Sequence, residues 1–240
     1  AVDLSRAAVD GAVEVTGELV TDSGVVGSIA HRADRGRMLV VEHRRLGRVY
    51  RLVVGSTVNG ICARTSVPVV SVPTGWEPTS RAVPVITVAV QHPHEASGLL
   101  RVALAQAEAI GARVEVLHTW WLSNGFDNTA VDQPFRDEAA RTAQAEFEPV
   151  LQTLAVEFPS VSTHVTVRHA PPVEALLDAA ETSDLLVVGR RHHMLPAGSH
   201  LGPVARTVLD QSAAPVLVAP GADRPASGMH GERLPARATR

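Results

Sequence analysis

The 240-residue sequence predicts an α/β protein with a doubly wound, five-stranded parallel sheet that helices cover on both faces. Three observations carry this prediction. Short valine-rich apolar segments alternate with segments whose apolar residues recur at helical spacing. Such alternation implies crossover connections, in which helices join parallel strands. The apolar segments are also nearly continuous, as expected for strands that are buried on both faces.

The five strands of this predicted sheet lie between residues 82 and 220, the most regular part of the sequence. Each is a short apolar or alternating run bounded by glycine, proline or polar residues. In chain order, we predict strands over residues 83–90, 113–120, 162–168, 184–188 and 215–219.

Helical segments connect these strands. Apolar residues at helical spacing predict helices over 97–111, 135–158, 172–182 and 202–211, and Gly111 is expected to end the first of them. Pro149 predicts a kink or break in the second helix, because proline removes a backbone donor. Residues 122–134 are polar and turn-rich and predict a loop.

An internal repeat relates residues 37–73 to residues 184–220 at a constant offset of 147. The offset places Val69–Pro73 on Val216–Pro220 and Gly55 on Gly202. Residue 1 then corresponds to residue 148, so the first copy lacks the counterparts of residues 82–147. We therefore predict a partial first copy (1–73), a linker (74–81), a complete domain (82–220) and a disordered tail (221–240).

The partial copy, called the first segment below, is expected to keep strands around Val13–Val20, Met38–Val41 and Val67–Val72. The two strands that would lie between the first and second of these are absent, which leaves a gap in its sheet. Two interpretations remain: a fragment of a longer tandem protein, which we favour, or a rearranged segment that packs against the complete domain.

Composition narrows the classes of function. A net charge of −3 does not indicate a nucleic-acid-binding surface, which needs clustered basic residues. No apolar run approaches the roughly 18 residues of a membrane helix, and the N-terminus has no signal-peptide pattern. Cys62 is the single cysteine, so internal disulfides are excluded and a cytoplasmic protein is expected.

The stretch DLLVVG–RRHHMLPAGSHL–GPVARTVLDQSAAPVLVAP, residues 184–220, resembles the universal stress protein family. The resemblance implies an adenine-nucleotide α-hydrolase-like, Rossmann-like sheet with strand order 3-2-1-4-5. It also implies a bacterial regulatory or stress-response role without catalysis. Members commonly pair through their final strands, which predicts self-association or an internal pseudo-dimer in which residues 67–72 meet residues 215–219. The sequence names no protein partner.

Nucleotide-binding members carry Gly-x2-Gly-x9-Gly-Ser/Thr after the fourth strand, where backbone amides at a helix N-terminus hold phosphate. Here the corresponding residues are Gly189, His192, Gly202 and Pro203. Pro203 offers neither a hydroxyl nor a backbone N–H. The aspartate that the family places after the first strand is replaced by Gln91. The resemblance therefore implies a nucleotide site in degenerate form.

The first segment keeps the Gly-Ser end of the motif as Gly55-Ser56, but Glu42 stands at the first glycine position, so a competent site there is not expected. An alternative for the complete domain is ATP binding with slow ATP turnover. In that case the basic loop residues would replace the lost donors by charge; they are Arg190, Arg191, His192, His193 and His200.

Two further hypotheses have less support. An adenylating enzyme of related architecture would need an SGGxDS-like loop where QHPHEAS stands. The histidines of the loops, His92 and His94 with the histidines of the 190–200 loop, lack the cysteine partners or helical spacing of a metal site. We expect no catalytic residues and no metal.

Overall fold

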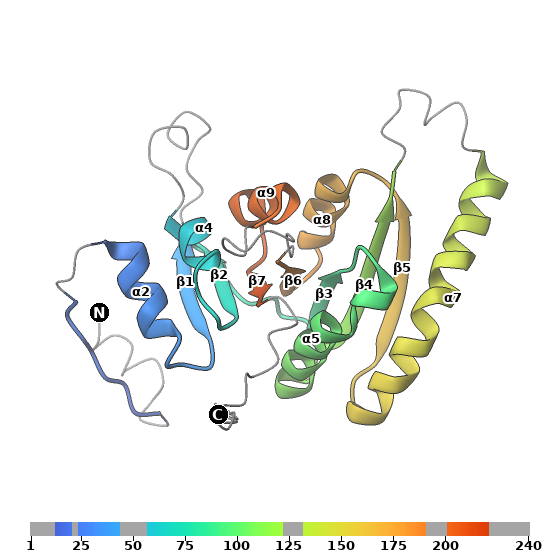
Figure 1. Ribbon diagram of the computed structural model, residues 1–240. Helices are drawn as coiled ribbons and strands as arrows, with labels where there is room; N and C mark the ends of the chain where they lie inside the picture. The colour runs from blue at the N-terminus through green and yellow to red at the C-terminus, as the bar shows by residue number, and fades with distance from the viewer. Residues whose placement is uncertain (1–12, 21–23, 44–56, 122–131, 191–200, 221–240) are drawn as a thin grey trace, which may run out of the picture.

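The computed structural model describes residues 13–20, 24–43, 57–121, 132–190 and 201–220. Within these ranges seven strands form one sheet in the order β1-β2-β7-β6-β3-β4-β5 (Figure 1). In chain order the strands are β1 (Leu39–His43), β2 (Val69–Pro73), β3 (Val85–Ala89), β4 (Arg113–Trp120), β5 (Thr163–His169), β6 (Leu185–Gly189) and β7 (Val216–Ala219). The predicted α/β class is confirmed, but the sheet has seven strands rather than five.

Helices enclose this sheet through two buried clusters. They are α2 (Val25–Ala33), α4 (Thr57–Cys62), η1 (Pro93–Glu95), α5 (Ser97–Ile110), α7 (Gln133–Glu157), α8 (Pro172–Ala180) and α9 (Pro203–Gln211). One cluster joins α2, α4, α8 and α9 to the sheet, and the other joins α5 and α7 to it. Strand residues alternate between the clusters: Val218 belongs to the first and Leu217 to the second. The sheet is thus sandwiched, as the nearly continuous apolar strands require.

The helix α7 corrects one expectation from the sequence. It runs without a break from Gln133 to Glu157 and passes through Pro149. It begins two residues earlier than predicted, because the Asp132 side chain accepts a hydrogen bond of 3.0 Å from the Phe135 backbone N–H. No helix in the described part of the chain is both long and apolar enough to cross a membrane.

Strands β3 to β7 are all parallel and lie in the order β5-β4-β3-β6-β7. The chain leaves β3 toward β4 and β5 on one side and returns to β6 and β7 on the other. The direction of winding therefore reverses between β3 and β6, whose carboxyl ends lie side by side. In open α/β sheets, this reversal point is where ligands bind.

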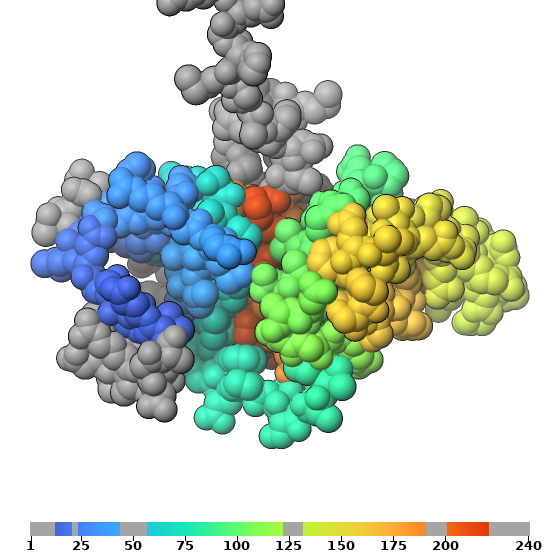
Figure 2. All heavy atoms as spheres, turned by 90° about the horizontal axis from the view of Figure 1, so that it is seen from below, coloured from blue at the N-terminus to red at the C-terminus, as the bar shows by residue number. Residues whose placement is uncertain are grey.

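The first segment joins the complete domain through its last strand. β2 pairs with β7 in the antiparallel direction, with Val69 opposite Val218, Val70 opposite Leu217 and Ser71 opposite Val216. β1 then pairs with β2 in parallel, so the sheet is mixed rather than parallel throughout. Figure 2 shows the blue-to-teal first segment and the green-to-yellow residues on opposite sides of the orange residues of the 201–219 region.

Two other expectations for the first segment are affected. Residues 13–20 form no strand, although their counterparts at the 147 offset overlap β5. A strand there would need the counterpart of β4 as its ladder partner, and the printed sequence contains none. The two-strand gap does not prevent β1 and β2 from pairing, because both lie on the same side of it. The segment packs against the complete domain in this way.

Candidate functional site

The candidate site lies at the carboxyl edge of the sheet, where β3 and β6 end. Gly189 is the last residue of β6, and Gln91 follows β3 by two residues. Gly202 is the N-cap of α9 and Pro203 is its first residue. This helix leads into β7, which pairs with β6. The topology thus brings four of the predicted residues to one edge at the reversal point.

The two glycines at this edge have ordinary backbone angles. Gly202, the N-cap of α9, has φ −63° and ψ 162°, and Gly189 is not among the described glycines with positive φ. A Cβ built on Gly189 would lie 3.5 Å from Cδ2 of Leu99 in α5, which is a normal contact distance. Neither glycine therefore adopts the left-handed backbone that only glycine takes readily.

The N-terminus of α9 lacks one of its anion donors. Pro203 is the first helical residue and has no backbone N–H. The first helical hydrogen bond runs from the Arg206 N–H to the Gly202 carbonyl at 3.1 Å. Within the helix, the Thr207 hydroxyl donates to the Pro203 carbonyl at 3.0 Å. Pro203 thus contributes neither a backbone N–H nor a hydroxyl at this helix end.

The side chain of Arg190, which follows Gly189, reaches into the first segment. Its guanidinium donates to the backbone carbonyl and, at 3.0 Å, to the hydroxyl of Thr65, and it reaches the Val67 carbonyl at 3.4 Å. The residue is only 8% exposed. Burial lowers the pKa of Arg190, but an arginine stays protonated in a protein. This residue therefore joins the two parts of the chain, contrary to the alternative that it binds phosphate.

The remaining predicted residues are placed as follows. His192, Gly55 and Ser56 lie outside the described residues, as do Arg191, His193 and His200. Gln91 is exposed. Glu42, at the first glycine position of the first segment, is exposed on β1. His92 and His94 have ring centroids 5.7 Å apart, but no group of three metal-ligating side chains occurs among the described residues.

Sequence reasoning missed two polar and aromatic groupings. His43 Nδ1 and the Ser71 hydroxyl form a buried hydrogen bond of 2.8 Å between β1 and β2. The ring centroid of His169, at the end of β5, lies 4.1 Å from the ring centroid of Trp120, at the end of β4. It lies 5.3 Å from the ring centroid of Trp121. The 147 offset places His43 on Arg190, so the two residues occupy equivalent positions in the two copies.

Comparison with known proteins settles the family. The model of the universal stress protein family matches residues 84–220, more than half of the chain. The chain belongs to the universal stress protein family. A universal stress protein of Mycobacterium tuberculosis is 27% identical over 215 residues, which cover 87% of this chain and 66% of that protein. The chain thus spans about two thirds of the length of the curated relatives it matches.

A solved member of the universal stress protein family shares the fold, and a second is similar over a shorter part of the chain. One from Archaeoglobus fulgidus has a TM-score of 0.61 and 19% identity, with 88% of this chain and 71% of that chain covered. Another universal stress protein from Archaeoglobus fulgidus, in complex with dAMP, has 22% identity over 57% of this chain and 97% of its own, with a TM-score of 0.38.

Proposed function

We propose that this member of the universal stress protein family is a non-catalytic regulatory module of the stress response, acting in the cytoplasm. Its first segment docks on the complete domain through the final strands, and the nucleotide site at the β3–β6 edge is degenerate. The orientation of Arg190 is the observation that carries the proposal. The residue next to the first motif glycine donates its hydrogen bonds to Thr65 and Val67 instead of facing a ligand.

The junction supports the docking part of this proposal. Ile61 and Cys62 of α4 pack in one buried cluster with Val208 and Leu209 of α9. These are repeat counterparts at the 147 offset, so equivalent surfaces meet. Pairing β2 with β7 also satisfies two strand edges that would otherwise be exposed. The same strand surfaces would serve self-association in a chain without a docked first segment.

The altered phosphate loop supports the second part. Pro203 lacks both the backbone N–H and the hydroxyl that the family motif provides at its position, and Arg190, which donates to Thr65, does not replace them. A charge-assisted hydrogen bond contributes about 1.5–3 kcal/mol, so two losses weaken binding by several orders of magnitude if they add.

The second candidate is an ATP-binding member with slow ATP turnover. It is favoured by the meeting of Gly189, Gln91 and Gly202 at the reversal point, which is the geometry that nucleotide sites use. Donors from residues 191–200 would then have to replace those lost at Pro203.

Calorimetric titration of MgATP, and separately of dAMP, into the protein distinguishes the two candidates. The degenerate site predicts negligible heat for the natural sequence and recovered binding in the double variant H192G/P203S, which restores the motif. Tight binding by the natural sequence that is lost in Gly202→Leu would establish the ATP-binding alternative instead. Gly27→Leu serves as the matched control, because a Cβ at Gly27 in α2 meets no atom within 4 Å.

A further inference from the structure

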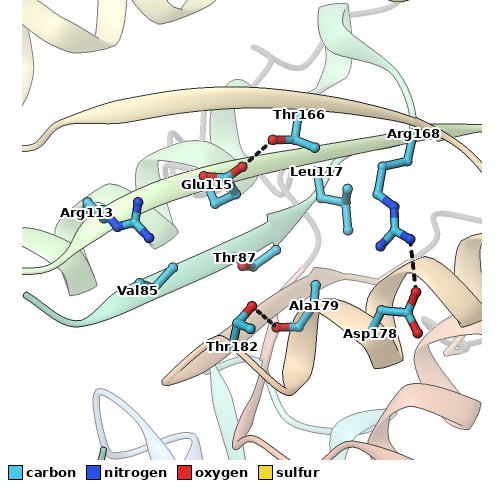
Figure 3. Close-up of a pocket in the computed structure, with 10 residues that line it drawn as sticks. All are labelled: Val85, Thr87, Arg113, Glu115, Leu117, Thr166, Arg168, Asp178, Ala179 and Thr182. Carbon is cyan, nitrogen blue, oxygen red and sulfur yellow. Dashed lines mark hydrogen bonds and ion pairs between the residues drawn. The ribbon is translucent and has the colours of Figure 1, made fainter. Parts of the chain in front are cut away.

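A pocket of about 430 Å³ lies on the face of the sheet that carries α8 (Figure 3). None of the residues of the candidate nucleotide site lines it. Its floor consists of side chains of β3, β4 and β5, and its wall is the last turn of α8 with Thr182. The volume falls within the roughly 300–1,000 Å³ of small-molecule sites.

The floor of this pocket is polar because of strand alternation. On β4, Arg113 and Glu115 face the pocket, whereas Val114 and Val116 are buried in the cluster beneath α5 and α7. On β5, Thr166 and Arg168 face it in the same way. Three charged residues and a threonine thus lie beside the apolar Leu117, which is only 4% exposed. A few polar groups on a partly apolar wall is the composition of ligand sites.

An ion pair lies at one end of the pocket. Arg168 donates to the Asp178 carboxylate at 2.9 Å and to the Ala175 carbonyl at 3.4 Å, which ties the end of β5 to α8. These two charges pair with each other at this end of the pocket.

The other two charges are available. Glu115 accepts a hydrogen bond from the Thr166 hydroxyl through one oxygen, Oε1. Among the described residues, the Arg113 guanidinium has no hydrogen-bond or ion-pair partner. Figure 3 shows both side chains over the same face of β4, on the side of the sheet where α8 lies. Residues two apart on a strand have Cα atoms about 6.6 Å apart, so one short molecule can contact both.

We propose that this pocket binds a small zwitterion with an aliphatic body, of the class of free amino acids and dipeptides. The ammonium group would lie against the free oxygen of Glu115 and the carboxylate against Arg113. The aliphatic side chain would pack on Leu117 and Ala179. Opposite charges at the two contacts select a zwitterion over a simple anion or cation, since either alone leaves one pocket charge unpaired.

The test is a heteronuclear NMR titration of the full chain with L-leucine and, in a parallel series, with leucyl-leucine. Saturable shifts are expected for the amides of β4 and the last turn of α8. The better-bound of the two shows whether an amino acid or a dipeptide fits. N-acetyl-leucine, which lacks the ammonium charge, and leucinamide, which lacks the carboxylate, are each expected to bind at least about tenfold more weakly.

Variants locate the contacts. R113Q and E115Q should each weaken binding of the natural zwitterion at least about tenfold, since each removes one charge-assisted contact. E146Q is the control, because Glu146 is exposed on α7. Absence of saturable shifts with both zwitterions would overturn the proposal, and so would equal binding of N-acetyl-leucine to the unaltered protein. Undiminished binding by both variants would do the same. The ligand series needs no substitution, so it decides the question even if a variant does not fold.

Discussion

Val70 of β2 and Leu217 of β7 lie directly opposite each other, and they are also counterparts in the internal repeat. On either side of them the register crosses over: Val69 faces Val218, the counterpart of Ser71, while Ser71 faces Val216, the counterpart of Val69. A local two-fold axis therefore passes between Val70 and Leu217. The first segment docks as a symmetry mate would, although it lacks half of the elements of the complete domain.

We expect a charge to disrupt the junction only where it replaces a side chain that is buried there. Val69 is fully buried at the junction, whereas Val40 on β1 is 60% exposed. Val69→Asp should release the first segment, because an unpaired buried charge costs several kcal/mol. Hydrogen exchange should then show loss of protection in β1 and β2, with β3–β6 still protected. Val40→Asp should change stability by less than about 0.5 kcal/mol. Equal effects of the two substitutions would contradict the assignment.

Arg190 should contribute to stability through its contacts with the first segment. Arg190→Met removes the donors to Thr65 and Val67 and leaves the buried Thr65 carbonyl without its guanidinium partner, which costs about 1–3 kcal/mol. Urea unfolding measures this cost. Arg206→Met is the control, since Arg206 is exposed on α9 and should have little effect. If the two variants are equally stable, the guanidinium does not join the two parts of the chain.

Asp34 should make the first segment sensitive to acid. The backbone N–H and hydroxyl of Ser66 donate to its Oδ1 at 2.8 and 2.7 Å, and they lower the pKa of Asp34. A lowered carboxyl pKa contributes stability that is present at neutral pH and is lost as pH falls through that pKa, below about pH 4. Asp34→Asn should therefore be less stable than the natural protein at pH 7, and the two should converge in acid. A difference that does not depend on pH would count against the carboxylate.

Cys62 should be inert in the folded protein. The thiol is fully buried, and burial raises its pKa to about 11. Since the thiolate is the reactive form, a disulfide reagent at pH 8 should label Cys62 slowly in native protein and rapidly in urea. Rapid stoichiometric labelling of the native chain would mean that the α4–α9 contact opens readily.

Much of the fold could be predicted from local pattern. Valine-rich runs such as Val85–Ala89 and Val216–Ala219 can bury their apolar side chains only in a sheet that is covered on both faces. The 147 offset, which comes from the sequence alone, also places Val25, the first residue of α2, on Pro172, the first residue of α8. The repeat predicts a strand over residues 13–20, but the structure has none there. A sequence pattern indicates the propensity of a segment to form a strand, but not whether a partner strand is present to pair with it.

The candidate site was less predictable. The chain topology makes it certain that Gly189 and Gln91 reach the same sheet edge, so their grouping could be foreseen. The direction of the Arg190 side chain could not be foreseen, because an arginine next to a glycine loop can bind either a phosphate or backbone carbonyls. The Arg113–Glu115 pocket was missed because charged residues two apart on a strand usually indicate only a solvated face.

The most direct test of the account is a cysteine cross-link at the local axis, in the variant V70C/L217C with Cys62→Ser. Directly opposed residues of antiparallel strands have Cα atoms about 4.5–5.5 Å apart, which permits a disulfide. The account predicts rapid oxidation to a cross-linked monomer, detected by mass spectrometry, with V40C/L217C remaining reduced. A free dithiol, or a cross-link found only between two chains, would contradict the docking of the first segment on its own complete domain.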